Sequence, residues 1–314
     1  MFVKNQRLRG QQLVRRYKKI YQIADEIDIS EKMILKHWEL EKRLAKQLRE
    51  STEDTRWNTF EKCYTELFLE IDWLNREIGT SDGTSPQKKY MVWPLLLGHD
   101  IEKIYEIGSG KGELINYLVN QGYTCKGTEI THERGKKHVP DHSRLSWGIS
   151  DGVHFDQFEA KGNYDAVISN QVIERIHPDD LLAHLQSVWL ILADDGKYIF
   201  TTPHKFIGPS DISKVFKCDK PLGMHLKEYS YIEIRELLMK SDFKRVKAVW
   251  NIPGKINRIL NIPFKPYCSC LLCSYLCAIE RIISFIPYQF IRRKATLVSR
   301  FIFFTPSIFI VAEK

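Results

Sequence analysis

The sequence predicts an α/β fold built on a seven-stranded, mostly parallel sheet, and three observations support it. From about residue 100, short apolar segments of strand type alternate with amphipathic segments of helix type. A glycine-rich turn joins the first such strand to the first helix. The last segment, 307–314, is again apolar in the manner of a buried strand. Because strands that alternate with helices form βαβ units, most of the strands are expected to run parallel.

The expected strands are apolar segments bounded by glycine, proline or charged residues. They lie at 103–108, 123–130, 144–151, 164–170, 196–203, 243–250 and 307–314. The helices between them are expected at 112–122, 178–193 and 230–242, with Pro178 near the first turn of the second helix.

The segments outside this pattern divide the chain. Residues 11–77 have apolar residues at helical spacing, with Ser51 as the expected N-cap of one helix, and 79–88 has the composition of a linker. We therefore predict a helical N-terminal region at 1–80, an α/β domain at 81–250 closed by the strand 307–314, and a helical insertion at 251–306 between the last two strands.

Positive charge is concentrated in two segments. The chain of 314 residues has a net charge of +8, while residues 1–20 and 251–306 each carry +7 and the remainder carries −6. Such segments favour a polyanionic partner, which is a nucleic acid, an anionic membrane surface or a phosphate-bearing substrate.

Targeting signals and cysteine content point to the cytoplasm. The basic N-terminal segment lacks the long apolar run of a signal peptide, and no run reaches the roughly 18 apolar residues of a transmembrane helix. Seven cysteines in a chain of this length do not indicate a secreted disulfide framework. A cytoplasmic location is therefore expected.

The glycine-rich turn lies in YEIGSGKGEL, residues 105–114. A phosphate-binding loop of the G-x-x-x-x-G-K-[ST] type is excluded because Gly112 follows Lys111. The dinucleotide pattern G-x-G-x-x-G is excluded because Glu113 stands at its third position, where its charge would repel a pyrophosphate. The remaining pattern, acid-x-G-x-G-x-G, is the one used for S-adenosylmethionine.

Acidic residues follow the next two strands. Glu129 ends the second strand, 21 residues after Gly108, where a carboxylate suits the two hydroxyls of a ribose. Asp151 ends the third strand, where it would take an adenine amino group. The fourth strand ends at Ser169 and Asn170, which would border the methyl group.

With these motifs in series, residues 101–250 and the strand 307–314 resemble the class I S-adenosylmethionine-dependent methyltransferases, whose sheet is Rossmann-like. The resemblance implies which residues contact each part of the cofactor. The methionine and ribose parts are held by Glu106, Gly108, Gly110 and Glu129. Asp151 and the backbone of Gly152 hold the adenine, Ile130 packs on the adenine ring, and Asn170 lies by the amino group and the sulfonium. One departure concerns Glu174–Arg175, where many relatives have Glu-His, so that no role of that histidine carries over.

Methyl transfer to an oxygen needs a general base, most often a histidine. His204 follows the fifth strand and His225 lies in GMHLKEYS, and both are expected near the carboxyl edge of the sheet. Glu174 and His177, after the fourth strand, are alternates. The competing interpretation of each histidine is a solvated or structural residue.

The insertion contains the run CSCLLCSYLC with Cys268, Cys270, Cys273 and Cys277. No second knuckle or histidine follows, so no metal is expected. On a helix Cys270, Cys273 and Cys277 would form one apolar packing face. The following RIISFIPYQFIRRK combines apolar, aromatic and basic residues, as an interfacial amphipathic element does. The alternative is a helical lid with a solvated basic face.

These observations lead to one function and two rivals. We expect methyl transfer from S-adenosylmethionine to a small-molecule acceptor, lipid-like or a lipid-linked glycan, by a cytoplasmic enzyme that is peripheral at the membrane. Segments 202–216 and 224–238 resemble relatives that modify small molecules, glycans and lipids, which disfavours nucleic acid as the substrate. The rivals are an RNA methyltransferase that uses the basic segments and a non-catalytic cofactor-binding scaffold.

Overall fold

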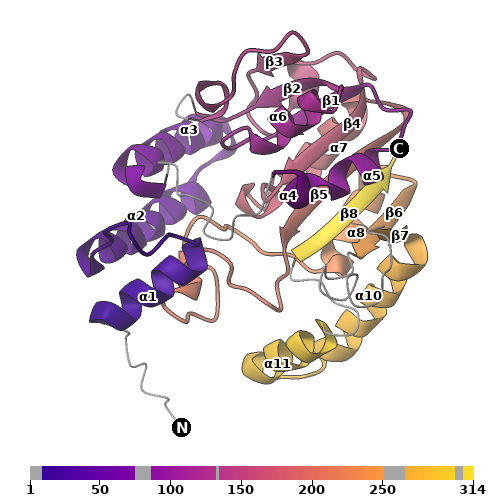
Figure 1. The fold of residues 1–314 in the computed structure, drawn as a ribbon. Coiled ribbons are helices and arrows are strands. Elements are labelled where there is room, and N and C mark those ends of the chain that lie inside the picture. Colours follow the sequence, from indigo (N-terminus) through magenta and orange to yellow (C-terminus); the bar gives the residue numbers. More distant parts are fainter. Residues whose placement is uncertain (1–8, 75–85, 132–133, 251–265, 301–306) are drawn as a thin grey trace. The chain divides into compact units, whose positions relative to one another are not determined.

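The computed structural model describes residues 9–74, 86–131, 134–250, 266–300 and 307–314 (Figure 1). The chain divides into two compact units. The helical unit consists of residues 1–84 and 208–226, and the sheet unit consists of residues 85–207 and 227–314. The sequence assigned 208–226 to the α/β domain, whereas this segment is part of the helical unit.

The helical unit contains three α-helices and two short 3₁₀ helices among its described residues. They are α1 (Gly10–Tyr21), α2 (Glu31–Glu50), α3 (Glu53–Glu70), η1 (Asp72–Leu74) and η5 (Ile212–Lys214). Leu13 and Tyr17 of α1 and Ile34 of α2 pack with Ile212 and Val215 in one buried cluster. The segment 208–226 is therefore joined to the N-terminal helices by apolar contacts.

The expected N-cap at Ser51 is wrong by one residue. Thr52 occupies the N-cap position of α3. Ser51 instead ends α2, where its hydroxyl donates to the carbonyl of Leu48 at 2.6 Å. The serine satisfies an open carbonyl of the preceding helix rather than an open N–H of the next one.

The sheet unit contains an eight-stranded sheet in the order β3-β2-β1-β4-β5-β8-β6-β7. The strands are β1 (Lys103–Ile107), β2 (Thr124–Thr128), β3 (Leu145–Gly148), β4 (Tyr164–Asn170), β5 (Leu192–Pro203), β6 (Arg245–Trp250), β7 (Tyr267–Ser269) and β8 (Ser307–Glu313). β1 to β5 are mutually parallel, and β8 runs antiparallel between β5 and β6. The predicted α/β class and mostly parallel sheet are confirmed, but the described residues form eight strands and not seven, because three residues of the insertion pair with the edge of β6 as β7.

The three helices expected between the strands are present, with small shifts of their ends, and the described residues add two short helices before β1 that were not expected. The helices of the sheet unit are α4 (Pro86–Tyr90), α5 (Val92–Leu97), α6 (Glu113–Asn120), α7 (Leu181–Ile191), α8 (Tyr231–Lys240), α10 (Cys270–Ser284) and α11 (Gln289–Arg300), with 3₁₀ helices η2 (Gly135–His138), η3 (Phe155–Gln157) and η4 (Ile173–Arg175). α7 begins at Leu181, so Pro178 lies in the turn before it, near its first turn as expected. Of the expected linker 79–88, residues 79–85 lie outside the described residues and 86–88 begin α4.

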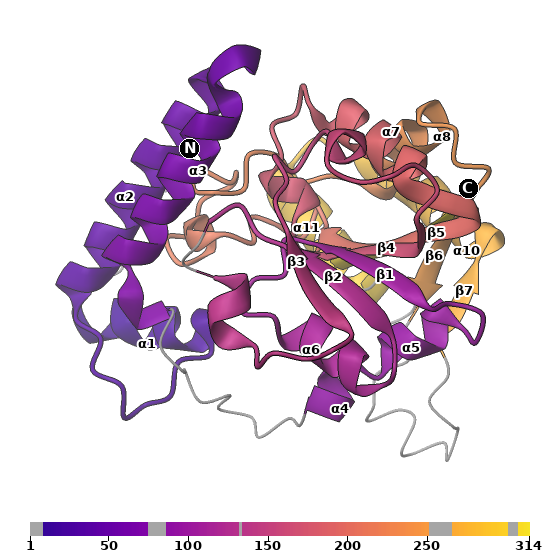
Figure 2. The same cartoon turned by 90° about the horizontal axis from the view of Figure 1, so that it is seen from above.

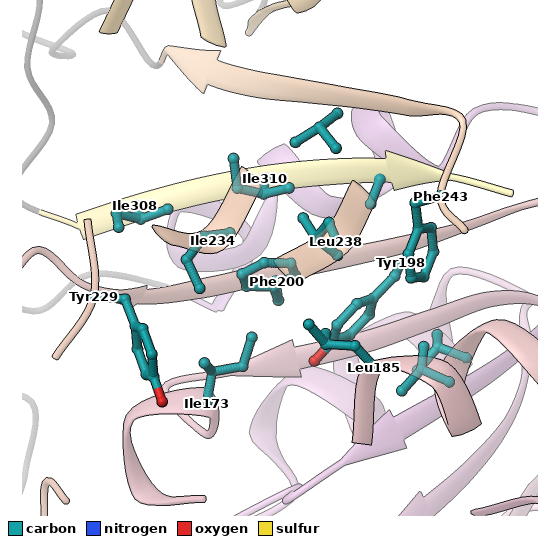
Figure 3. Packing of buried hydrophobic residues seen from close by; sticks show 14 of the residues in the cluster. Ile173, Leu185, Tyr198, Phe200, Tyr229, Ile234, Leu238, Phe243, Ile308 and Ile310 are labelled. Atoms are coloured by element: carbon teal, nitrogen blue, oxygen red, sulfur yellow. The ribbon is translucent and has the colours of Figure 1, made fainter. Parts of the chain in front are cut away.

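The two faces of the sheet carry separate cores because successive side chains of a strand point to opposite sides. Tyr198, Phe200 and Ile310 belong to the core on the face covered by α7, α8 and α10. Figure 3 shows these side chains together with Ile234 and Leu238 of α8. Ile199 and Phe309, the neighbours on the same strands, belong to the core on the face covered by α4, α5 and α6 (Figure 2).

The insertion is described in part, as β7, α10 and α11. Cys273 and Cys277 of α10 are buried in the core of the sheet unit, as expected, but Cys270, the first residue of the helix, is exposed. Among the described residues, no group of three or more ligating side chains could hold a metal ion. The described helices also include none that is both long and apolar enough to cross a bilayer.

Candidate active site

The glycine loop follows β1 and leads into α6. Gly108 and Gly110 have φ angles of +65° and +59°, the left-handed region that favours glycine. A Cβ atom at Gly108 would lie 2.7 Å from Val172 Cγ2, so a side chain there would clash. A Cβ at Gly110 would meet nothing within 4 Å. The loop is therefore tight on one side and open at Gly110, which leaves room for a ligand against its backbone.

Glu129 is anchored to this loop by its carboxylate. The backbone N–H of Gly110 donates to Oε1 at 2.6 Å, and the N–H of Ile130 donates to Oε2 at 3.1 Å. Burial raises the pKa of Glu129, and the nearby Arg134 acts in the opposite direction. A carboxylate has about four acceptor sites, so both oxygens can accept further hydrogen bonds from a diol.

Glu106, the acid before the glycines, is 2% exposed and lacks a partner at one oxygen. Its Oε2 and the hydroxyl of Thr131 are buried without a hydrogen bond within the described parts of the chain. Burial raises the pKa of Glu106 to about 8, and the hydroxyl of Ser109 opposes this rise. Buried polar atoms are almost always hydrogen-bonded in folded proteins. The residues therefore fit S-adenosylmethionine, whose ammonium group would supply the donor that Glu106 lacks.

Asp151 and Gly152 form a turn that is held by the protein itself. Oδ1 of Asp151 accepts from the N–H groups of Val153 and His154 at 2.8 and 2.7 Å, and Oδ2 lies 2.7 Å from Nδ1 of His154. The N–H of Gly152 donates to Ser150 Oγ at 2.9 Å. The turn is rigid, and the predicted contacts of Asp151, Gly152 and Ile130 with an adenine remain predictions.

His184 is a residue of this region that the sequence analysis did not find. It is fully buried in α7, with Nδ1 at 2.7 Å from the carbonyl of Gly152 and Nε2 at 3.3 Å from the hydroxyl of Tyr198. Because a carbonyl can only accept, Nδ1 carries the proton, and burial lowers the pKa of the ring to about 4. His184 is thus neutral and joins the Gly152 turn to Tyr198 of β5, and in the sequence it is one of three polar residues in the otherwise apolar helix LLAHLQSVWLI.

The end of β4 is fixed by β5. Oδ1 of the exposed Asn170 accepts from Thr201 Oγ1 at 2.5 Å, and Gln171, at a φ of +61°, donates from its backbone N–H to the Thr201 carbonyl at 2.9 Å. The register pairs Ile107 with Thr128 on one side and with Ser169 on the other. The residues that follow these three are Gly108, Glu129 and Asn170, so the structure brings them to one carboxyl edge of the sheet, the usual place for a ligand in such folds.

His204, the first candidate base, lies in a closed hydrogen-bond network. Its ring is fully buried, Nδ1 accepts from the N–H of Phe206 at 3.1 Å, and Nε2 lies 2.6 Å from Oε1 of Glu280 in α10. Glu280 also accepts from the N–H groups of Tyr231 and Ile232, at 2.7 and 3.0 Å, at the start of α8. This geometry favours a structural role for His204, and its role as a base stays a prediction.

The other candidates are distributed over both units. Glu174 is fully buried and accepts from Thr202 Oγ1 at 3.0 Å. His177 is nearly buried, with Nδ1 at 3.5 Å from a carboxylate oxygen of Asp179. His225 belongs to the helical unit and is also buried. Their roles in catalysis remain predictions.

His225 follows a turn that two buried carboxylates of the helical unit hold in place. Glu41 accepts from the N–H of Met224 at 3.1 Å, and Asp211 accepts from the N–H of Gly223 at 2.8 Å. Glu41 in turn lies 2.7 Å from Nε2 of His37. No motif in the sequence indicates this cluster, because His37 and Glu41 look like ordinary polar residues of an amphipathic helix.

Comparisons with known proteins identify the family of the chain. The family described as "Methyltransferase domain" matches residues 80–248, more than half of the chain. No curated protein matches the chain. The chain belongs to this methyltransferase family, and it is an S-adenosylmethionine-dependent methyltransferase of class I with a Rossmann-like sheet.

Solved structures with similarity to the chain include three that cover most of it. A SAM dependent methyltransferase from Archaeoglobus fulgidus has a TM-score of 0.46 and 15% identity, with 73% of this chain and 91% of that chain covered. The 1,6-didemethyltoxoflavin-N1-methyltransferase of Burkholderia thailandensis has a TM-score of 0.48 and 12% identity, with 84% and 91% covered. A phosphoethanolamine N-methyltransferase 2 from Haemonchus contortus has a TM-score of 0.43 and 16% identity, with 71% and 50% covered. The acceptors in the names of the last two enzymes are those of these enzymes.

Proposed function

We propose that the protein methylates a small-molecule acceptor with a long apolar part, a lipid or a lipid-linked glycan. The observation that carries this proposal is the attachment of α10. Glu280 of α10 is hydrogen-bonded to His204, directly after β5, and to the N–H of Tyr231 at the start of α8. The exposed Ile282 and Phe285 follow Glu280 on the same helix. An apolar surface is thereby fixed to the carboxyl end of a central strand, where a methyl acceptor with an apolar chain would bind.

The residues of the chain have separate tasks in this reaction. Bound S-adenosylmethionine supplies a methyl group on a positively charged sulfur, which is reactive without further activation. Glu129 would accept hydrogen bonds from the ribose and Glu106 would pair with the ammonium group, which would hold the methyl group in one orientation. Orientation of this kind is the main contribution that a protein makes to such a displacement.

An acceptor oxygen must also lose its proton, and His225 is the first of the predicted bases to test. His204 has both ring nitrogens engaged within the protein, and Glu174 is fully buried beside Thr202. Replacement of His225 by alanine is then expected to lower turnover by roughly 10²–10⁴-fold, the usual contribution of a general base, with an unchanged affinity for the cofactor. Equal turnover of the variant and the native protein would move the role to His177.

The acceptor class is tested with S-adenosylmethionine that carries a labelled methyl group. The native protein is incubated with a total lipid extract, with water-soluble metabolites or with RNA, and the label is followed into each fraction. Label in the organic-soluble fraction supports the proposal. Label in RNA would favour the rival RNA methyltransferase, and label in the water-soluble fraction alone would exclude the lipid-like acceptor. A protein that binds the cofactor but labels no fraction would fit the non-catalytic scaffold. Glu129→Ala is the control for label that does not depend on the site.

A further inference from the structure

One side of α10 is apolar and exposed. Leu271, Tyr275, Ala278, Ile282 and Phe285 are all exposed, Leu271 to 78%, Ile282 to 68% and Phe285 to 85%. Their spacing of four and three residues places them along one face of the helix. The opposite face carries apolar residues that are buried in the core of the sheet unit: Leu272, Cys273, Leu276 and Cys277.

The exposed side continues after the end of α10. Tyr288 is 68% exposed, and Ile291 and Val298 of α11 are exposed as well. We call the exposed residues of α10 together with these three the apolar face. Large apolar side chains that are exposed on a protein surface are normally scattered singly. A continuous row of them on two neighbouring helices is uncommon where no partner binds.

The charge around the apolar face has one sign. Arg281, Arg293 and Lys294 are at least partly exposed within this segment. The only acid among residues 266–300 is Glu280, which is fully buried and bound to His204 and the start of α8. The exposed charges of α10 and α11 are therefore all positive.

Arg292 fixes the second helix next to the first. Its guanidinium donates from Nη2 to the carbonyl of Ile286 at 2.8 Å and lies over the ring of Phe206, 5.4 Å from its centre. The turn between the two helices is thus held by the sheet unit itself. The apolar face and its cations accordingly form a surface of fixed geometry.

We propose that the apolar face and its cations bind to an anionic lipid bilayer, with α10 and α11 lying at the interface. Aliphatic side chains for the acyl region, tyrosines for the headgroup level and cations for anionic lipids are the three components of interfacial helices. An RNA partner would bind the cations but would leave the apolar side chains of Leu271, Ile282 and Phe285 without a contact, so a bilayer fits this surface better. None of the described helices is both long and apolar enough to cross a bilayer, and the proposed mode of binding is peripheral. The inference does not depend on the identity of the acceptor, although it would bring the enzyme to a lipid-like one.

Sedimentation with vesicles tests this surface directly. The full chain is mixed with phosphatidylcholine vesicles that contain or lack phosphatidylglycerol. Tighter binding to the anionic vesicles is expected, by about fivefold for each basic residue at the surface, and added salt should reduce the preference. The double variant Ile282→Ser/Phe285→Ser should lose binding to both kinds of vesicle. The double variant Arg281→Gln/Lys294→Gln should lose only the preference for the anionic ones.

The matched control is Leu69→Ser, because Leu69 is an exposed residue of α3 with a relative exposure of 60%. It should bind as the native protein does. Negligible binding of the native protein to both vesicles would overturn the proposal, as would equal losses in Leu69→Ser and in the double serine variant. Self-association that disappears in the serine variant would instead assign the apolar face to a second copy of the chain. S-adenosylmethionine affinity, measured on every variant, separates these outcomes from a failure of the methyltransferase site.

Discussion

Two buried acids of the sheet unit, Glu106 and Glu280, differ in how their oxygens are used. Glu280 is fully buried, and it accepts hydrogen bonds from His204 and from the N–H groups of Tyr231 and Ile232. Glu106 is 2% exposed, and its Oε2 has no hydrogen bond within the described residues. Burial raises the pKa of Glu106 to about 8.

The difference separates a structural acid from a ligand-binding one. The hydrogen bonds of Glu280 join β5, α8 and α10, so removal of its carboxylate affects the fold. The unused oxygen of Glu106 lies next to the glycine loop and leaves a position for a donor from outside the protein. Burial alone is the same for both residues, and only the state of their hydrogen bonds distinguishes them.

The largest expected effect is on stability, through Glu280. Glu280→Ala leaves the His204 ring and two N–H groups of α8 without their acceptor. Loss of one partner of a buried pair of this kind destabilises a protein by roughly 3–5 kcal/mol. The midpoint of urea unfolding measures the change, with Glu236→Ala, an exposed position of α8, as the control. An unchanged midpoint would remove the structural role that we assign to the His204–Glu280 pair.

The second effect is on cofactor binding, through Glu129. Glu129→Ala should remove the hydrogen bonds to the ribose, each worth roughly 1.5–3 kcal/mol for a charged acceptor. Titration calorimetry with S-adenosylmethionine measures the loss. Glu280→Ala, under conditions where this variant is folded, should keep the native affinity for S-adenosylmethionine. The two variants would then separate an acid that binds the cofactor from one that stabilises the fold. A native affinity in Glu129→Ala is the result that contradicts the site.

The third effect is steric and concerns Gly108 and Gly110. Both alanine variants place a side chain at a positive φ, which destabilises the backbone by roughly 1–2 kcal/mol. Only at Gly108 would the added Cβ also meet Val172, at 2.7 Å. Thermal unfolding should therefore show a larger loss for Gly108→Ala, and Val172→Ala should restore part of it. Equal losses in the two glycine variants, with no rescue, would show that the contact with Val172 is unimportant.

A fourth effect follows from the raised pKa of Glu106. With a folded pKa of about 8, this group is mostly protonated at pH 7. An ammonium group beside it favours the charged form, so cofactor binding should release close to one proton at pH 7, and affinity should rise as the pH increases towards 8. Calorimetry in buffers of different ionisation enthalpy counts the protons. Glu106→Gln should release about one proton fewer, and the same release in both proteins would contradict this assignment.

The sequence predicted the sheet and the cofactor edge because both depend on local patterns. Alternating apolar segments predict strands, and the acid before Gly108 and the acid at Glu129 follow from the chain alone. The extra strand β7 could not be predicted, since its three residues pair only because β6 offers a free edge. The partnership of His204 with Glu280 joins residues that are 76 positions apart, and no local pattern announces it. His184 was missed for the same reason.

The smallest expected effect concerns His184, which is buried as Glu106 is but has its polar atoms satisfied. Its folded pKa of about 4 lies below the usual value of 6.5, so the unfolded chain binds more protons between these two pH values. Stability should therefore fall as the pH decreases through this window, and the contribution of His184 between pH 7 and 5.5 amounts to about 1 kcal/mol. His184→Gln keeps a donor for Gly152 and an acceptor for Tyr198 but does not titrate. Urea unfolding at the two pH values should thus show a smaller loss for His184→Gln than for the native protein. His99→Gln, at an exposed histidine, is the control for the other histidines and should keep the native loss. If His184→Gln lost as much stability as the native protein, His184 would not be the neutral connector between the Gly152 turn and β5.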